Sequence, residues 1–202
     1  RTGGRLCVLQ AVGRSGFSSA GAIDMHDIQE KVCLIIPCYN ESKRLDVRRF
    51  TESCSHYRFL FVNDGSSDRT SELIQGSLDD RTRLLELPEN RGKAEAVRAG
   101  MLHAYRNAPM NDAEWFGFWD ADLATPLSEV DWLLRFAELT GERVDAIWGS
   151  RIFRLGSDID RSFTRHVAGR LFATLAGFSL HISSYDSQCG AKLFRRGSVE
   201  KA

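Results

Sequence analysis

The chain has 202 residues, enough for one full domain, and its 43% hydrophobic and 27% charged residues are typical of a globular protein. Lys and Arg together number 27, as do Asp and Glu, so no overall field recruits nucleic acid or an anionic membrane, and we expect no nucleic-acid partner. Five scattered cysteines without a CxxC pair argue against a disulfide framework or a zinc site, and no run of about 18 uncharged apolar residues is present to span a bilayer.

The first 29 residues differ in composition from the rest of the chain. They contain several arginines, many Gly, Ser and Ala residues, and no acid before Asp24. This composition fits a transit-like leader, a disordered extension, or a stretch upstream of a start at Met25. We therefore expect residues 1–29 to lie outside the fold and residues 30–202 to form it.

From residue 31 onwards, short apolar runs alternate with segments of helical periodicity. In chain order we expect a strand over 31–37, a helix near 43–54, a strand over 58–64, a helix from Ser67 or Asp68, a strand over 83–88, a helix over 91–106, a strand over 115–120, a helix opened by Pro126 and a strand over 145–150. Repeated strand–helix–strand units predict right-handed crossovers and a mostly parallel, doubly wound α/β sheet in a single domain.

Polar residues collect where the predicted strands end. They occupy 37–41 (PCYNE), 63–66 (NDGS), 120–122 (DAD) and 149–151 (GSR). Ligands of open parallel sheets bind outside the carboxyl ends of the strands. The sequence therefore predicts a binding site at this edge of the sheet.

Asp120 and Asp122 directly follow the apolar strand WFGFW. Side chains at i and i+2 of an extended segment point the same way, so the two carboxylates can share one hard cation and leave coordination places for diphosphate oxygens. A D-x-D pair also arises by chance in a chain of this length, and the alternative is a solvated turn in which an Asp caps the next helix. The position after a buried strand favours the metal site.

Two further motifs place charged groups near the same edge. Asp64 begins a tight turn, and its carboxylate suits ribose hydroxyls or ring N–H donors but would repel phosphate. Arg91 and Lys93 stand at the start of the predicted helix 91–106, where they meet a base or a diphosphate, or are simply solvated.

The motifs IIPCYNE, VNDGSSDRT, NRGKAEAVRAG, DADLATP, GSR and DSQCGAKLFRR occur in order across residues 31–196. Together they resemble the family 2 inverting glycosyltransferases of GT-A fold, within the branch of dolichyl-phosphate mannose synthases, dolichyl-phosphate glucosyltransferases and bacterial polyprenyl-phosphate relatives. The resemblance implies a Rossmann-like GT-A catalytic domain over residues 30–202 that is cytoplasmic and works at the cytoplasmic face of a membrane. Relatives often continue past this point into membrane-spanning helices, and the sequence leaves open whether such a region is missing here.

The resemblance also implies roles for individual residues at the strand ends. Donor binding falls to Pro37, Tyr39, Glu41, Asp64, Arg91, Lys93 and Asp120, of which the first three line the nucleoside pocket. Asp120 and Asp122 would hold Mg²⁺ or Mn²⁺ against the diphosphate of a donor such as UDP-glucose or GDP-mannose, which makes Asp122 catalytic. The mannose synthases have a metal-ligating Gln two residues after the second Asp, whereas this chain has Ala124.

The acceptor side has two interpretations. If a sugar hydroxyl attacks, Asp186 is the candidate general base. If a lipid phosphate attacks, cationic positioning matters more, and Arg151, Arg161 and Arg165 supply it. The adjoining segment 163–175 has an apolar face that either packs in the core or leans on a membrane surface as a peripheral contact.

The resemblance thus implies a metal-dependent transferase that moves a hexose, with inversion, from a nucleotide-diphosphate sugar to a polyprenyl or dolichyl phosphate. The alternatives are the same donor chemistry with a saccharide hydroxyl acceptor, or an inactive nucleotide-sugar-binding module. A nucleotidyltransferase is disfavoured because no glycine-rich phosphate loop follows the first strand.

Overall fold

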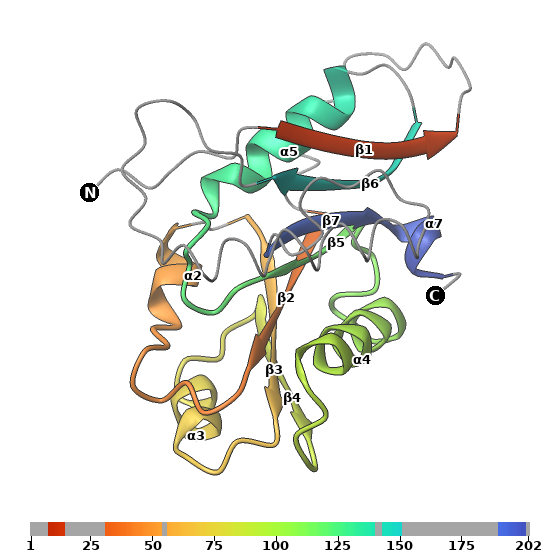
Figure 1. Cartoon of the computed structure of the whole chain (residues 1–202). Coiled ribbons are helices and arrows are strands. Elements are labelled where there is room, and N and C mark those ends of the chain that lie inside the picture. The colour runs from red at the N-terminus through yellow and green to blue at the C-terminus, as the bar shows by residue number, and fades with distance from the viewer. Residues whose placement is uncertain (1–7, 15–30, 54–55, 140–142, 151–189, 201–202) are drawn as a thin grey trace, which may run out of the picture.

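The computed structural model describes residues 8–14, 31–53, 56–139, 143–150 and 190–200 (Figure 1). Arg151, Arg161, Arg165 and Asp186, to which the sequence assigns the acceptor side, lie outside these residues.

The described strands form one seven-stranded sheet in the order β1-β6-β7-β5-β2-β3-β4. Their bounds are β1 Val8–Arg14, β2 Val32–Cys38, β3 Arg58–Asp64, β4 Thr82–Leu87, β5 Trp115–Trp119, β6 Arg143–Ser150 and β7 Ala191–Arg195. The pairs β5–β2, β2–β3 and β3–β4 are parallel, as the alternating pattern predicts.

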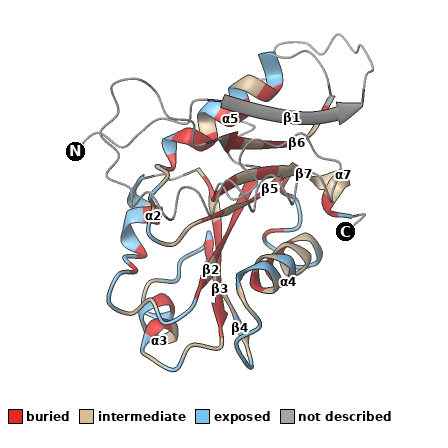
Figure 2. Cartoon of the chain, viewed as in Figure 1, coloured by how far each residue is buried: buried red, intermediate tan, exposed pale blue. Residues whose placement is uncertain are grey.

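Helices cover both faces of the sheet (Figures 1 and 2). They are α2 Arg48–Ser53, α3 Thr70–Gln75, α4 Lys93–Arg106, α5 Ser128–Leu139 and α7 Arg196–Val199. Buried residues of α2, α3 and α5 join the apolar cluster on one face, and those of α4 and α7 join the cluster on the other. The result is the predicted α/β architecture of a central sheet between two helical layers. None of the helices in the described ranges has the length and apolar character needed to cross a membrane.

The strand β2 shows why the central strands read as continuous apolar runs. Leu34 and Ile36 belong to the cluster under α2, α3 and α5, whereas Cys33 and Ile35 belong to the cluster under α4. All four side chains are fully buried. A strand covered on both faces has no solvent-facing positions, so it shows no alternation of polar and apolar residues.

Two strands were not predicted. β7 pairs antiparallel with both β5 and β6 and lies between them, so β6, expected at 145–150, is not a direct neighbour of β5. The sequence of β7, AKLFR, is short and partly charged, and therefore does not show the continuous apolar run that predicts a buried strand. β1 pairs antiparallel with β6 at the sheet edge, which corrects the expectation that residues 8–14 lie outside the fold with the rest of 1–29. An edge strand needs no continuous apolar run.

Gly100 allows α4 to approach the sheet closely. A Cβ placed on Gly100 would lie 2.7 Å from the Cγ2 atoms of both Ile35 and Val62. Both neighbours are fully buried and β-branched, and therefore have little freedom to move away.

We expect Gly100→Ala to lower the melting temperature although alanine favours helix. The gain in helix propensity is about 1 kcal/mol, whereas overpacking costs about 1–3 kcal/mol. Gly197→Ala is the matched control, because Gly197 is also helical and has open space where the Cβ would lie. Thermal unfolding should show Gly197→Ala at or above the wild type, and equal stabilisation by both variants would contradict the packing argument.

Candidate active site

A cavity of about 490 Å³ lies at the carboxyl ends of β2, β3 and β5, beside the start of α4. Its lining residues come from four of the motifs: Pro37, Cys38, Tyr39, Glu41, Asp64, Asn90, Gly92, Lys93, Asp120 and Asp122. The structure therefore brings together the residues to which donor and metal binding were assigned, except Arg91, which does not line the cavity. Cys38, Asn90 and Gly92 are lining residues that the sequence did not single out.

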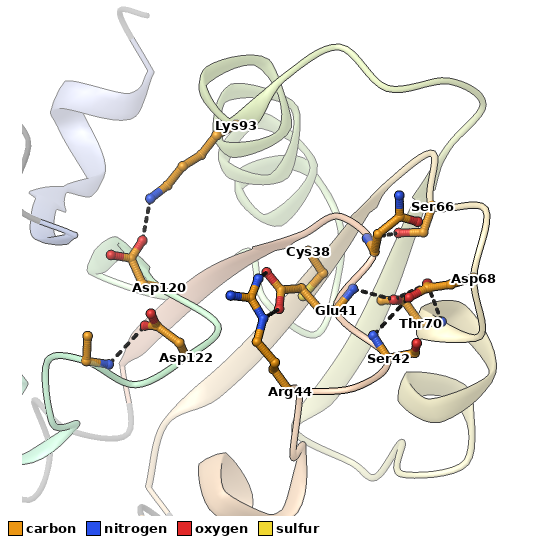
Figure 3. A network of polar contacts seen from close by, with 12 residues as sticks. Cys38, Glu41, Ser42, Arg44, Ser66, Asp68, Thr70, Lys93, Asp120 and Asp122 are labelled. Carbon is orange, nitrogen blue, oxygen red and sulfur yellow. Dashed lines mark hydrogen bonds and ion pairs between the residues drawn. The ribbon is translucent and has the colours of Figure 1, made fainter.

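The carboxylate of Asp120 is fixed from two sides. The ammonium of Lys93, the first residue of α4, forms an ion pair with its Oδ1 atom (Figure 3). On the other side Gly190 precedes β7, and a Cβ at Gly190 would lie 1.9 Å from Oδ2 of Asp120. Position 190 therefore accepts only glycine while Asp120 keeps this place.

Asp122 belongs to the turn that follows β5. Its Oδ1 accepts a hydrogen bond from the amide of Ala124 at 3.0 Å, and Leu123 between them has a φ of 52°. The side chain thus closes a local turn, as in the alternative interpretation, while it also lines the cavity with Asp120.

Asp64 is almost fully buried at the end of β3, with 2% of its surface exposed. Its two carboxylate oxygens accept hydrogen bonds from the backbone amides of Arg91 and Gly92, each at 2.9 Å. Its carbonyl accepts a third from Asn90 Nδ2 at 3.3 Å. Asp64 therefore holds the loop that leads into α4 and thereby the backbone beside Lys93. The sequence did not reveal this role, since the turn around Asp64 gives no sign of partners so distant in the chain.

Arg91 extends towards Glu89 and not into the cavity. Its Nη2 lies 3.2 Å from Glu89 Oε1, and half of the arginine side chain is exposed. In this structure the side chain of Arg91 is therefore solvated, whereas that of the nearby Lys93 lines the cavity.

The loops after β2 and β3 are joined by hydrogen bonds from backbone amides to side chains (Figure 3). The amide of Glu41 donates to Thr70 Oγ1 at 2.8 Å, and that of Ser42 donates to Asp68 Oδ2 at 3.1 Å. Hydrogen bonds from Ser42 and Thr70 hold the pKa of the Asp68 carboxyl well below its ordinary value.

Asn40 makes the remaining links between these loops. Its amide donates to Ser66 Oγ at 2.9 Å, and its Oδ1 accepts from the Ser67 amide at 2.9 Å. Asn40 has a φ of 53°, a conformation that asparagine tolerates better than most residues. The cross-links fix the backbone beside Tyr39, whose side chain is half exposed.

Glu41 is paired within its own loop. Arg44 Nε and Nη2 donate to the two Glu41 oxygens at 3.0 and 2.8 Å, a bidentate arrangement. A ligand that uses Glu41 would have to share the carboxylate with Arg44.

The site contains no reactive thiol among the described residues. Burial raises the pKa of Cys38, which lines the cavity, well above its ordinary value, and burial raises the pKa of Cys33 to about 12. Both thiols remain protonated near neutral pH and are poor nucleophiles.

Comparison with known proteins identifies the same family as the motifs. The profile of glycosyl transferase family 2 matches residues 33–202. A dolichyl-phosphate beta-glucosyltransferase of Drosophila melanogaster is 35% identical over 190 residues, which cover 85% of this chain and 56% of that protein. One of Trichomonas vaginalis is 33% identical over 188 residues, covering 85% and 55%, respectively. The chain spans about half the length of these curated relatives.

Solved structures support the fold. Glucosyl-3-phosphoglycerate synthase from Mycobacterium tuberculosis, solved in complex with Mn²⁺, UDP-glucose and phosphoglyceric acid, superposes with a TM-score of 0.57 at 18% identity. The match covers 90% of this chain and 64% of that one. At this identity the likeness shows a shared GT-A fold.

The pH dependence of stability should reveal the Asp68 cross-link. A carboxyl whose pKa is lowered by folding contributes stability above its ordinary pKa of 3.8, and this contribution is lost as the pH falls below that value. Asp68→Asn should therefore melt at a lower temperature than the wild type at pH 7, and the difference should narrow as the pH falls from 5 to 3. Asp80→Asn, which alters an exposed residue, is the control. If the difference in melting temperature between Asp68→Asn and the wild type did not depend on pH, the stabilising role of the charged Asp68 carboxylate would be contradicted.

Proposed function

Because the chain belongs to glycosyl transferase family 2, we propose that it moves a hexose, with inversion, from a nucleotide-diphosphate sugar to a polyprenyl or dolichyl phosphate. The observation that carries the proposal is the cavity at the carboxyl edge of the sheet, where Asp120 and Asp122 line the same space as Lys93. An enzyme that releases a nucleoside diphosphate needs positive charge near the departing oxygens, and this part of the cavity offers a lysine and two carboxylates suited to a cation.

UDP-glucose is the donor that we favour over GDP-mannose. The relatives in Drosophila melanogaster and Trichomonas vaginalis carry the name of glucosyltransferases, and the synthase from Mycobacterium tuberculosis was solved with UDP-glucose. Ala124, at the position where mannose synthases have a metal-ligating Gln, agrees with the glucosyltransferase branch.

Asp120 and Asp122 are the residues that would hold Mg²⁺ or Mn²⁺. Carboxylate oxygens suit these hard cations. Asp120 already pairs with one positive charge, the ammonium of Lys93. No group of three or more His, Cys, Asp or Glu residues in the described ranges is placed to hold a metal. Diphosphate oxygens and water are further ligands of the kind that these cations accept. When bound, the cation would neutralise charge on the leaving nucleoside diphosphate.

The rest of the cavity would receive the nucleoside. Tyr39 presents a half-exposed ring for stacking on the base, and the cross-links between the loops after β2 and β3 hold the backbone beside it. The Asp64 oxygens each retain a lone pair beyond those used by the amides of Arg91 and Gly92. These can accept from a ring N–H or a ribose hydroxyl.

The acceptor would bind to residues of the segment that connects β6 and β7. β6 ends and β7 begins at the edge of the sheet where Asp120 lies, because Trp148 pairs with Lys192 and Ala191 pairs with Trp119. Residues 151–189, which contain Arg151, Arg161, Arg165 and Asp186, connect these two points.

In the proposed reaction an oxygen of the lipid phosphate attacks the anomeric carbon as its bond to the nucleoside diphosphate breaks. The arginines of the connecting segment would position this anion, which needs little deprotonation, at the cytoplasmic face of a membrane. With a saccharide hydroxyl as the acceptor, Asp186 would take the hydroxyl proton.

Donor and metal use can be tested by thermal shift. UDP-glucose with Mn²⁺ should raise the melting temperature of the full chain more than GDP-mannose with Mn²⁺ or UDP-glucose with EDTA, because only a ligand bound to the native state stabilises it. Transfer to dolichyl phosphate should then be measured. Asp122→Asn should keep the fold and lower the transfer rate by about 100-fold or more, since metal charge supplies several kcal/mol.

Each outcome bears on the alternatives. Binding of UDP-glucose without transfer to any acceptor would indicate the inactive binding module. Transfer to a saccharide and not to lipid phosphate would indicate the hydroxyl acceptor. Full activity of Asp122→Asn would refute the metal assignment.

Gly190→Ala tests the placement of Asp120. The new Cβ cannot coexist with Oδ2 of Asp120 in its present position, so the carboxylate must move and Mn²⁺-dependent stabilisation by UDP-glucose should fall. Gly197→Ala, in α7 beyond the other end of β7, has open space for its Cβ and is the control. Undiminished Mn²⁺-dependent binding by Gly190→Ala would show that the position of Asp120 is not required.

A further inference from the structure

Lys93 pairs with the carboxylate that the proposed metal site needs. Its Nζ contacts Oδ1 of Asp120, with 55% of the lysine and 29% of the aspartate side chain exposed. Two cations at contact distance from the same carboxylate repel each other. A divalent ion that binds Asp120 therefore weakens the ion pair with Lys93 or displaces the ammonium.

Lys93 occupies an unfavourable position for a cation. It is the first residue of α4, a helix of 14 residues, and the N-terminus of a helix carries partial positive charge. A lysine there repels the helix dipole unless an anion compensates it. Asp120 is the anion that compensates it in the described structure.

A donor bound in the cavity would offer the ammonium a second anion. While it is paired with Asp120, Lys93 Nζ also lies 5.5 Å from the centroid of the Phe118 ring, within the range of a cation–π contact. A lysine ammonium is a compact charge on a flexible stem, so it can leave one anion for another. The diphosphate of a donor bound in the same cavity would offer such an anion.

We propose that Lys93 is an exchangeable counter-cation: it holds Asp120 in place before the divalent ion binds, and it passes to the donor diphosphate when the ion takes Asp120. The inference rests on the proposed function, since it assumes a divalent ion at Asp120 and Asp122. Its consequence is ordered charge exchange. Metal that binds alone weakens or breaks the ion pair of Lys93 with Asp120, whereas metal that arrives with the donor supplies a new anion for Lys93. Metal and donor should therefore bind more tightly together than separately.

The test is a titration of the full chain with Mn²⁺ alone. Electron paramagnetic resonance measures the concentration of free Mn²⁺ at each step. Lys93→Met removes the charge and retains the length and apolar character of the side chain. Because a half-exposed ion pair no longer competes, Mn²⁺ alone should bind Lys93→Met about two- to fivefold more tightly than the wild type. The affinity for UDP in the presence of Mn²⁺ should fall in the same variant.

Two further variants separate this effect from other causes. Arg98→Gln removes a positive charge from the same helix, where Arg98 pairs with Glu95 away from the cavity lining, and should leave Mn²⁺ affinity unchanged. Lys93→Arg keeps the charge and should bind Mn²⁺ alone as the wild type does. If Arg98→Gln bound Mn²⁺ as much more tightly as Lys93→Met does, the loss of any positive charge on α4 would explain the increase in affinity. That result would overturn the specific role of Lys93.

The outcomes also distinguish the inference from the proposed function. If the wild type binds Mn²⁺ through Asp122, as judged by loss of binding in Asp122→Asn, but Lys93→Met binds it no more tightly, the inference alone fails. If the wild type does not bind Mn²⁺ even with UDP present, the proposed metal site fails and the inference fails with it.

Discussion

The position of one carboxylate, that of Asp120, links the sheet to the proposed chemistry. It stands directly after β5, its Oδ1 is paired with Lys93, and its Oδ2 faces a glycine with no room for a side chain. The two constraints come from segments far apart in the sequence, the start of α4 and the start of β7. Folding of both segments against β5 therefore creates an oriented anion that neither segment specifies alone.

The part of the cavity proposed to receive the nucleoside is organised by a different kind of interaction. There, side-chain oxygens accept hydrogen bonds from backbone amides that would otherwise face solvent or a ligand. Asp64 takes two amides of the loop before α4, and Thr70 and Asp68 take amides of the loop after β2. Since backbone donors that are already satisfied do not rearrange to find partners, the loops form a cavity wall that would need little adjustment on binding a ligand.

The parts of the fold that depend on local patterns were predictable, and those that depend on distant pairing were not. The strands β2, β3 and β5 are buried on both faces and read as unbroken apolar runs, so their positions and parallel pairing followed from the sequence. β7 contains two basic residues in five and has no such signal. The site shows the same division. The strand-end motifs predicted which side chains share the cavity, whereas the pairing of Asp120 with Lys93 and the contact with Gly190 require the three-dimensional arrangement.

The antiparallel course of β7 would allow the proposed donor and acceptor sites to share one edge of the sheet. β6 runs in the same direction as β5, since both are antiparallel to β7, and so it ends at the edge where Asp120 lies. A strand that continued the parallel pattern would require the chain to cross to the opposite edge before pairing. β7 instead starts at the edge where β6 ends, so the connection between them begins and finishes at the edge where the cavity lies. In the proposed function this connection supplies the acceptor-binding residues, while the ends of the central parallel strands line the cavity assigned to the donor.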